Sequence, residues 1–278
     1  MMIPMSDHRA GAANTLRQVL TVKTVTVSRL TYCTDLLFRA GSAKVRWAVL
    51  KAAAEAGITH FDTAPSYGFG VAENDLAALL RAHPGFTVAS KIGLHSPGGD
   101  DQGSRSVLLR KVAGKVFRSL SASQRDFRIT NAQQSLEGSL RRLGRDHIEL
   151  YLLHEPELHE LDQEVWLEWL LRQQQAGLIG QFGISLSPDR LMAFLAAGSP
   201  LAAVVQTEDS LSGQEADVLL QHGRMLEFTQ GYVAAERSAG RQTPEPEIIR
   251  LALSRNRSGS VLVNSIQPSV LRTLGSLP

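Results

Sequence analysis

Short apolar runs alternate along the chain with longer segments in which apolar residues recur every three or four positions. A short run bounded by polar or glycine residues is typical of a buried strand, and the longer period is typical of an amphipathic helix. The predicted strands cover residues 30–37, 58–63, 86–91, 148–154, 179–185, 203–206, 224–229 and 260–263. The predicted helices cover residues 43–56, 73–82, 131–143, 162–176, 188–197, 214–222, 246–254 and 268–274.

The ends of these segments carry the residues that helix termini require. Gly57, Gly144 and Gly177 follow three of the predicted helices, where a left-handed residue commonly ends a helix. Pro188 and Pro246 stand where two others begin, a position that tolerates proline because its N–H has no helical partner.

Eight strand-helix repeats in this order predict an α/β fold of the TIM barrel type, (β/α)₈, in a single domain. The length of 278 residues agrees, because such barrels contain about 250 residues. We expect residues 22–278 to form the barrel and residues 1–21 to be loosely ordered. Residues 95–126 form a long excursion after the third strand, which we expect to be a substrate-facing loop.

The composition excludes several classes of protein. With 43% hydrophobic and 20% charged residues, the chain is typical of a soluble globular domain, and it has no apolar stretch long enough to span a membrane. The net charge of +2 gives no indication of nucleic acid binding, and the basic stretch 105–128 is better explained as a solvated surface. Cys33, the single cysteine, forms no internal disulfide and completes no zinc pattern. We therefore expect a cytoplasmic protein without a metal.

Three neighbouring strands end in chemically reactive residues: Asp62 closes the second, Lys91 the third and His154 the fourth. The carboxyl ends of barrel strands share one rim, which is where barrel enzymes carry their active sites. Tyr67 follows Asp62 in a short turn that begins at Pro65 and directs the phenol over the same rim.

Together these four side chains are suited to proton transfer. Carbonyl reduction needs a hydride at carbon and a proton at the developing alkoxide. Tyr67 is the predicted acid, Lys91 is expected to lower its pKa, and Asp62 is expected to orient the lysine. His154 is expected to hydrogen-bond to the carbonyl oxygen.

The motifs around these residues resemble the aldo-keto reductase superfamily. The resemblance rests on residues 57–68 (GITHFDTAPSYG), Glu73, Ser90-Lys91 and residues 152–156 (LLHEP), and it extends from about residue 28 to nearly the end of the chain. In that family the matching Asp, Tyr, Lys and His are the catalytic tetrad, so the resemblance implies the same roles for Asp62, Tyr67, Lys91 and His154.

The resemblance also implies a nicotinamide cofactor, NADPH with NADH as the alternative. Ser185 and Gln206 match residues that hold the carboxamide, and Phe228 matches the aromatic residue that packs on the ring. The adenosine phosphate region is matched by residues 259–265 and 268–272, with Asn264, Ser265 and Arg272 as the implied contacts.

Several positions depart from the family pattern. Leu186 stands where an asparagine usually follows the serine, and Asn264 replaces a frequent lysine or glycine. Val270 stands where some members have a basic residue, and Leu274 replaces a common asparagine. The first strand also lacks the customary glycines around residues 30–33. These departures predict weaker cofactor binding and less discrimination against NADH.

The leading functional hypothesis is an NAD(P)H-dependent oxidoreductase that reduces a small aldehyde or ketone, or oxidises the alcohol. A second is a nucleotide-binding regulatory or interaction protein on the same scaffold with little turnover. A third is a barrel lyase or isomerase that uses Lys91 as a Schiff base. The substrate and the oligomeric state are not determined by the sequence.

Overall fold

The computed structural model describes residues 19–22, 25–95 and 124–277. Eight parallel strands close into a barrel in which each strand pairs with the next along the chain and the last pairs with the first. They are β3 (Leu30–Cys33), β4 (His60–Asp62), β5 (Thr87–Ile92), β8 (Ile148–His154), β9 (Ile179–Leu186), β10 (Val205–Glu208), β11 (Phe228–Gln230) and β12 (Ser260–Val263). The predicted (β/α)₈ barrel is therefore confirmed.

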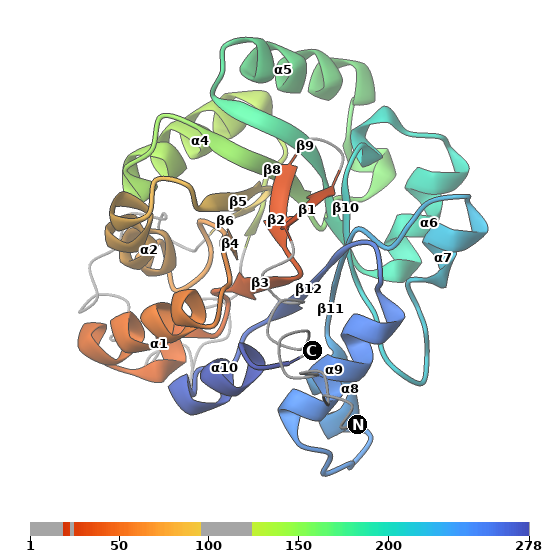
Figure 1. Cartoon of the computed structure of the whole chain (residues 1–278). Helices are drawn as coiled ribbons and strands as arrows, with labels where there is room; N and C mark the ends of the chain where they lie inside the picture. Colours follow the sequence, from red (N-terminus) through yellow and green to blue (C-terminus); the bar gives the residue numbers. More distant parts are fainter. Residues whose placement is uncertain (1–18, 23–24, 96–123, 278) are drawn as a thin grey trace, which may run out of the picture.

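Helices form an outer ring around the strands (Figure 1). The α-helices are α1 (Ala43–Glu55), α2 (Val71–Ala82), α4 (Ile129–Leu143), α5 (Gln163–Gln175), α6 (Pro188–Ala196), α7 (Asp217–Gln221), α8 (Tyr232–Ser238), α9 (Glu245–Arg255) and α10 (Pro268–Leu274). Short 3₁₀ turns occur at Leu37–Ala40, Leu158–Glu160 and Pro200–Ala202.

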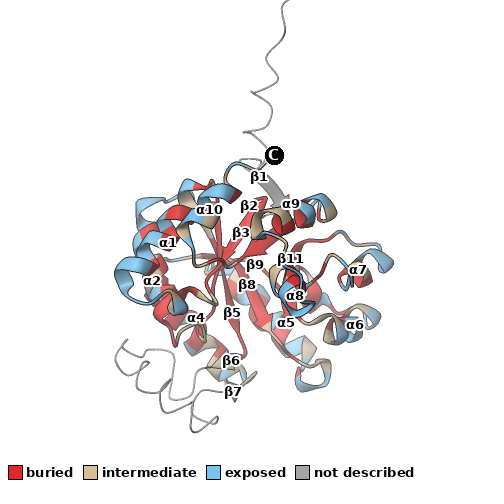
Figure 2. Ribbon diagram, turned by 90° about the horizontal axis from the view of Figure 1, so that it is seen from below, coloured by how far each residue is buried: buried red, intermediate tan, exposed pale blue. Residues whose placement is uncertain are grey.

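Helix α4 illustrates how the sequence specifies this ring. Ala132, Leu136 and Leu143 recur at helical spacing and are fully buried, so one face of the helix packs on the barrel. The helix ends at Gly144, whose φ of 62° is left-handed, as predicted. Figure 2 shows the same division throughout the molecule, with buried strands at the centre and exposed outer faces on the helices.

The amino-terminal end of the barrel is covered by an antiparallel hairpin, β1 (Val19–Val22) and β2 (Val25–Ser28). Val25 and Val27 belong to the inner core, together with Phe228 and Leu150 inside the barrel. The sequence analysis did not predict this hairpin. It leaves the opposite rim, formed by the carboxyl ends of the strands, as the open end.

The first predicted strand is shorter than expected. It ends at Cys33 instead of Leu37 because the chain turns there: the Leu37 amide donates to the Thr34 carbonyl at 3.0 Å, and the Asp35 carboxylate accepts from the Leu36 amide at 2.8 Å. The sequence analysis also did not predict helix α8.

Most of the excursion at residues 95–126 lies outside the described residues, as do residues 1–18 of the segment expected to be loosely ordered. The described ends of the excursion pair as two short strands, β6 (Leu94–His95) and β7 (Gln124–Arg125). Of the basic stretch at residues 105–128, the structure describes residues 124–128.

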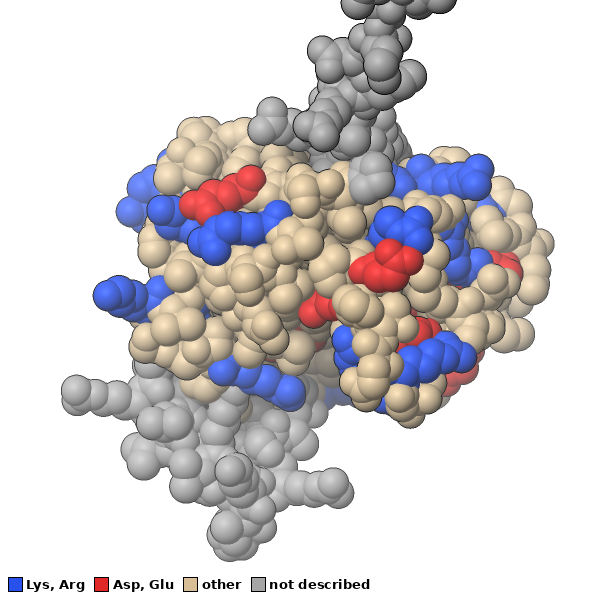
Figure 3. All heavy atoms as spheres, turned by 60° about the horizontal axis from the view of Figure 1, so that its bottom comes forward, with Lys and Arg blue, Asp and Glu red and all other residues tan. Residues whose placement is uncertain are grey.

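Acidic and basic side chains lie next to one another on the face shown in Figure 3. Among the described helices, none is long and apolar enough to cross a bilayer.

Candidate active site

Strand register places the predicted reactive residues on one rim. Asp62 pairs with Cys33 on β3, Lys91 with Leu152 on β8, and His154 with Ser185 on β9. Each lies at or one residue before the carboxyl end of its strand. The structure thus brings together side chains that are up to ninety-two positions apart in the sequence.

Lys91 is the centre of the group. Its Nζ donates to Asp62 Oδ2 at 2.6 Å, to the Thr63 carbonyl at 3.1 Å and to the Tyr67 hydroxyl at 3.2 Å. An ammonium group has three donors, so all of them are used. Because Lys91 and Asp62 are each about 1% exposed, the pair is shielded from water and its geometry is fixed.

Tyr67 enters the group from the loop between β4 and α2. Its amide donates to the Ala64 carbonyl at 3.0 Å, which closes the turn that aims the ring at the rim. The ring is half-buried, and Lys91 Nζ lies 4.8 Å from its centroid. Since the tyrosine oxygen accepts from Lys91, the phenol proton is directed elsewhere.

The pKa of Tyr67 is raised well above its usual value, first by burial and then by Cys33 and the carboxylates Asp62 and Asp35. This differs from the expectation that Lys91 would lower it. The physical reason is that the charge of Lys91 is balanced by Asp62 at 2.6 Å, so that loss of solvation dominates. The phenol therefore stays protonated at neutral pH in this structure.

His154 faces Tyr67 edge-on, with 6.0 Å between the ring centroids and an interplanar angle of 86°. Burial, and then the charge of Lys91, hold the pKa of His154 well below its usual value. The ring is therefore neutral at pH 7. Its Nδ1 is buried and has no hydrogen-bond partner among the described residues.

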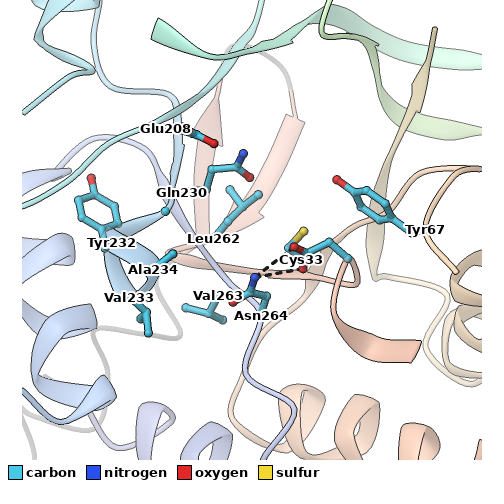
Figure 4. Close-up of a pocket in the computed structure, with 12 residues that line it drawn as sticks. Cys33, Tyr67, Glu208, Gln230, Tyr232, Val233, Ala234, Leu262, Val263 and Asn264 are labelled. Atoms are coloured by element: carbon cyan, nitrogen blue, oxygen red, sulfur yellow. Dashed lines mark hydrogen bonds between the residues drawn. The ribbon is translucent and has the colours of Figure 1, made fainter. Parts of the chain in front are cut away.

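A cavity of about 200 Å³ opens beside Tyr67 at the ends of β3, β10, β11 and β12 (Figure 4). Its polar lining includes Asp35, Glu208, Gln230 and Asn264. The Asn264 amide donates to both oxygens of Asp35, at 3.1 and 3.2 Å. No lysine or arginine is among the residues that line this cavity, so its described wall is acidic.

The residues predicted to hold the carboxamide lie together. Ser185 and Gln206 are paired in register on β9 and β10, and Ser185 is also paired with His154. Both are buried. The Gln206 amide donates to the Gln230 side chain at 3.1 Å, which connects it to the cavity wall.

Phe228, which was predicted to pack on the nicotinamide ring, lies in the inner core of the barrel. Its ring is fully buried in the barrel interior, 5.7 Å from the ring of His60, and it does not line the cavity. Two residues later on the same strand, Gln230 lines the cavity. Side chains on one face of a strand recur every two residues, so Phe228 and Gln230 share a face of β11, and Gln230 is the one that reaches the cavity.

The predicted phosphate contacts are dispersed. Asn264 lines the cavity, whereas Ser265 is buried behind it, with its carbonyl accepting from the Tyr32 hydroxyl at 3.2 Å. Arg272 is exposed and reaches Glu55 on α1, with 3.3 Å between Nε and Oε2. Its guanidinium is thus engaged with the helix layer and is not among the groups that line the cavity.

Leu186, which departs from the family pattern, is 2% exposed and packs in the outer core between strands and helices. Sequence reasoning also gave no role to Cys33, Asp35 and Gln230, all of which line the cavity. The polar run at residues 32–35, within the first predicted strand, was the available signal. Within the described parts of the chain, no cluster of His, Cys, Asp and Glu side chains is suited to holding a metal ion.

Residues 41–222 match the model of the Aldo/keto reductase family. Among curated relatives, a D-threo-aldose 1-dehydrogenase of a Pseudomonas species is 38% identical over 135 residues, which is 45% of this chain and 38% of that protein. A 6-dehydroglucose reductase of Agrobacterium fabrum is 31% identical over 114 residues, which is 40% of this chain and 33% of that protein. The chain thus matches less than half of the length of either relative.

Solved structures share the fold over almost the whole chain. An aldo-keto reductase from Pseudomonas aeruginosa, described as putative, has a TM-score of 0.69 at 22% identity and covers 96% of this chain and 97% of its own. The holo form of a Bacillus halodurans aldo-keto reductase has a TM-score of 0.68 at 18% identity, covering 93% of this chain and 89% of its own. With two thirds of its length matched by the family model and with this barrel, the chain belongs to the aldo/keto reductase family.

Proposed function

We propose that this protein is an NAD(P)H-dependent oxidoreductase that reduces a small aldehyde or ketone, with Tyr67 as the general acid. The observation that carries the proposal is the position of Lys91 Nζ, which forms a pair with Asp62 Oδ2 that is shielded from water and also donates to the hydroxyl of half-buried Tyr67. The same residues can serve the reverse reaction on an alcohol.

A bound reduced nicotinamide would supply hydride to the carbonyl carbon. Tyr67 gives its proton to the carbonyl oxygen as negative charge develops there. The Lys91 ammonium, 3.2 Å from the same phenol oxygen, stabilises the tyrosinate that remains. Asp62 holds that ammonium in place. Neutral His154 donates a hydrogen bond to the substrate oxygen without competing as the acid.

The described residues fit the nicotinamide end of the cofactor better than a phosphate. Ser185 and Gln206, both buried and polar, would hold the carboxamide. Among the residues that the structure describes in the cavity lining, Asp35 and Glu208 make an acidic wall and no cation is present to meet a 2′-phosphate. We therefore propose a nicotinamide cofactor with less preference for NADPH over NADH than a basic wall would give.

A second candidate function is a nucleotide-binding regulatory protein with little turnover. Buried Leu186 and the absence of a cation from the described cavity lining favour it, because fewer contacts to a bound nucleotide would leave the nicotinamide less well positioned for hydride transfer. A Schiff-base lyase is not supported, since all three donors of Lys91 are engaged.

The test is a parallel titration of the purified protein with NADPH and NADH by fluorescence quenching, followed by turnover assays on a carbonyl panel. The names of the two curated relatives suggest that aldoses and 6-dehydroglucose come first in that panel. Binding with turnover would support the reductase. Binding without turnover would favour the regulatory function, and failure of a protein with intact circular dichroism to bind either nucleotide would refute both.

A further inference from the structure

Cys33 occupies an unusual place in the site. It is the last residue of β3 and is paired in register with Asp62 on β4. Two residues earlier on the same strand, Thr31 is bonded to Ser260 deeper in the barrel, at 2.7 Å between the hydroxyl oxygens. The alternation of side chains along a strand therefore carries the Cys33 thiol upward to the level of the reactive rim.

The thiol has a defined hydrogen-bond partner. Cys33 Sγ donates to Asp62 Oδ2 at 3.2 Å, and this is the oxygen that also accepts from Lys91 at 2.6 Å. Asp62 Oδ1 is buried and has no partner among the described residues. The orientation of the carboxylate is thus set from two sides through a single oxygen, by the ammonium and by the thiol.

Cys33 also forms part of the wall beside the phenol. It lines the cavity together with Tyr67, and the tyrosine ring packs against the inner core cluster to which Cys33 belongs (Figure 4). With a side chain 3% exposed, it fills space that water would otherwise occupy. The titratable groups around it are Asp35 after its own strand, Asp62 on β4, Tyr67 in the following loop and Lys91 on β5.

We propose that Cys33 is a positioning residue for the reaction: its thiol orients the Asp62 carboxylate, and hence Lys91, while its sulfur keeps water away from the Tyr67 hydroxyl. The inference rests on the proposed reductase function. Cys33 itself transfers no proton, because burial raises the pKa of its thiol well above the usual value.

Three substitutions separate the two contributions. Cys33→Ala removes the donor and opens the wall, Cys33→Ser keeps the donor, and Cys33→Val keeps the wall without the donor. The measurements are kcat and KM for carbonyl reduction at saturating cofactor from pH 5 to pH 10, together with thermal midpoints to confirm folding.

We expect Cys33→Ala to lower kcat about 3- to 10-fold, which corresponds to the loss of one weak hydrogen bond, while the substrate KM changes less than about twofold. The alkaline limb of its pH profile moves to lower pH, because water admitted next to Tyr67 favours the phenolate. Cys33→Ser restores most of kcat, and Cys33→Val restores the alkaline limb but not kcat. Equal kcat in the Ala and Ser variants would overturn the role of the thiol as a donor, and an unmoved alkaline limb in the Ala variant would overturn its role in excluding water.

A second readout does not depend on turnover. The chain contains four tyrosines, so the Tyr67 signal in a protein labelled with ¹³C at the tyrosine ζ carbon can be assigned by its absence in Tyr67→Phe. Cys33→Ala should displace this signal and Cys33→Ser should return it toward the wild-type position. An unmoved signal refutes the positioning role even if the wild-type protein is active, whereas a displaced signal in a protein without turnover refutes the reductase proposal alone.

Discussion

Breaking the ion pair between Lys91 and Asp62 should separate its contributions to stability and to chemistry. Both side chains are about 1% exposed, with 2.6 Å between Nζ and Oδ2. Lys91→Met leaves a buried carboxylate without its cation, which costs about 3 to 5 kcal/mol of the free energy of unfolding. For a domain of this size, that loss lowers the thermal midpoint by roughly 5 to 10 °C.

The double variant Asp62→Leu/Lys91→Met removes both charges and should recover most of that stability, because an apolar pair of similar volume can replace a buried ion pair at little cost. Carbonyl reduction should not recover: both variants should lose about 10²-fold or more in kcat. Urea unfolding and steady-state kinetics on the same preparations measure the two effects.

Arg46→Met is the matched control, since Arg46 forms a largely buried ion pair with Asp75 between α1 and α2, at 2.5 Å. It should lose stability but keep kcat. Activity restored in the double variant, or a cost below about 1 kcal/mol for Lys91→Met, would refute this reasoning.

Asn264→Lys alone should change the ratio of the NADPH and NADH dissociation constants less than about threefold, because Asp35 neutralises the new charge. The double variant Asp35→Asn/Asn264→Lys should change this ratio about tenfold in favour of NADPH in parallel titrations. Equal ratios in the two variants would exclude Asp35 as the cause. His60 is buried and its pKa is lowered to about 3, first by burial and then by the charge of Lys91. The unfolded chain, with a histidine pKa of about 6.5, binds a proton first, so stability falls as pH decreases from about 6.5 to 3, by about 1.4 kcal/mol per unit. His60→Leu should reduce the slope in urea unfolding between pH 6 and pH 4 by about 1.4 kcal/mol per unit, while buried His154 keeps a contribution of its own, and an unchanged slope would contradict the assignment. Arg29 donates to four backbone carbonyls at the end of α9 and in the segment after it, so Arg29→Met should cost about 2 to 4 kcal/mol. Exposed Arg257→Met should cost less than about 0.5 kcal/mol, and equal losses in urea unfolding would argue against this role.

The barrel could be predicted from the sequence because its signals are local. Apolar runs and helical periods repeat eight times, and glycines such as Gly144 mark the helix ends. The hairpin β1–β2 could not be predicted in the same way. Val25 and Val27 are buried against the amino-terminal end of the barrel, and no pattern in their own segment of the sequence indicates this contact. Helix α8 begins after Gly231 without a capping side chain, so it lacks the usual start signal.

The reactive rim was also predictable, because parallel strands that share a barrel bring their carboxyl ends together whatever their separation in sequence. Depth along a strand was harder to predict. Phe228 and Gln230 lie on one face, and only the register with neighbouring strands shows which of them reaches the cavity. The direction of Arg272 depends on its contact with Glu55, which is 217 residues away in the sequence.

The net pKa of Tyr67 could not be obtained from residue types alone. A lysine beside a phenol lowers its pKa when the lysine charge is unbalanced. Here the carboxylate of Asp62 balances that charge, and burial becomes the larger effect. Sequence identifies such neighbours but not their distances.

The most direct test of the central claim is a single-turnover measurement on Tyr67→Phe. Enzyme in excess over reduced nicotinamide is mixed with the carbonyl substrate, and oxidation of the cofactor is followed by its absorbance. If Tyr67 is the proton donor, the variant reacts at least about 10²-fold more slowly than the wild type. Its cofactor dissociation constant should change less than about threefold, because the substitution removes one hydroxyl. A variant that binds cofactor normally and reduces the carbonyl at the wild-type rate would contradict the assignment of Tyr67 as the acid.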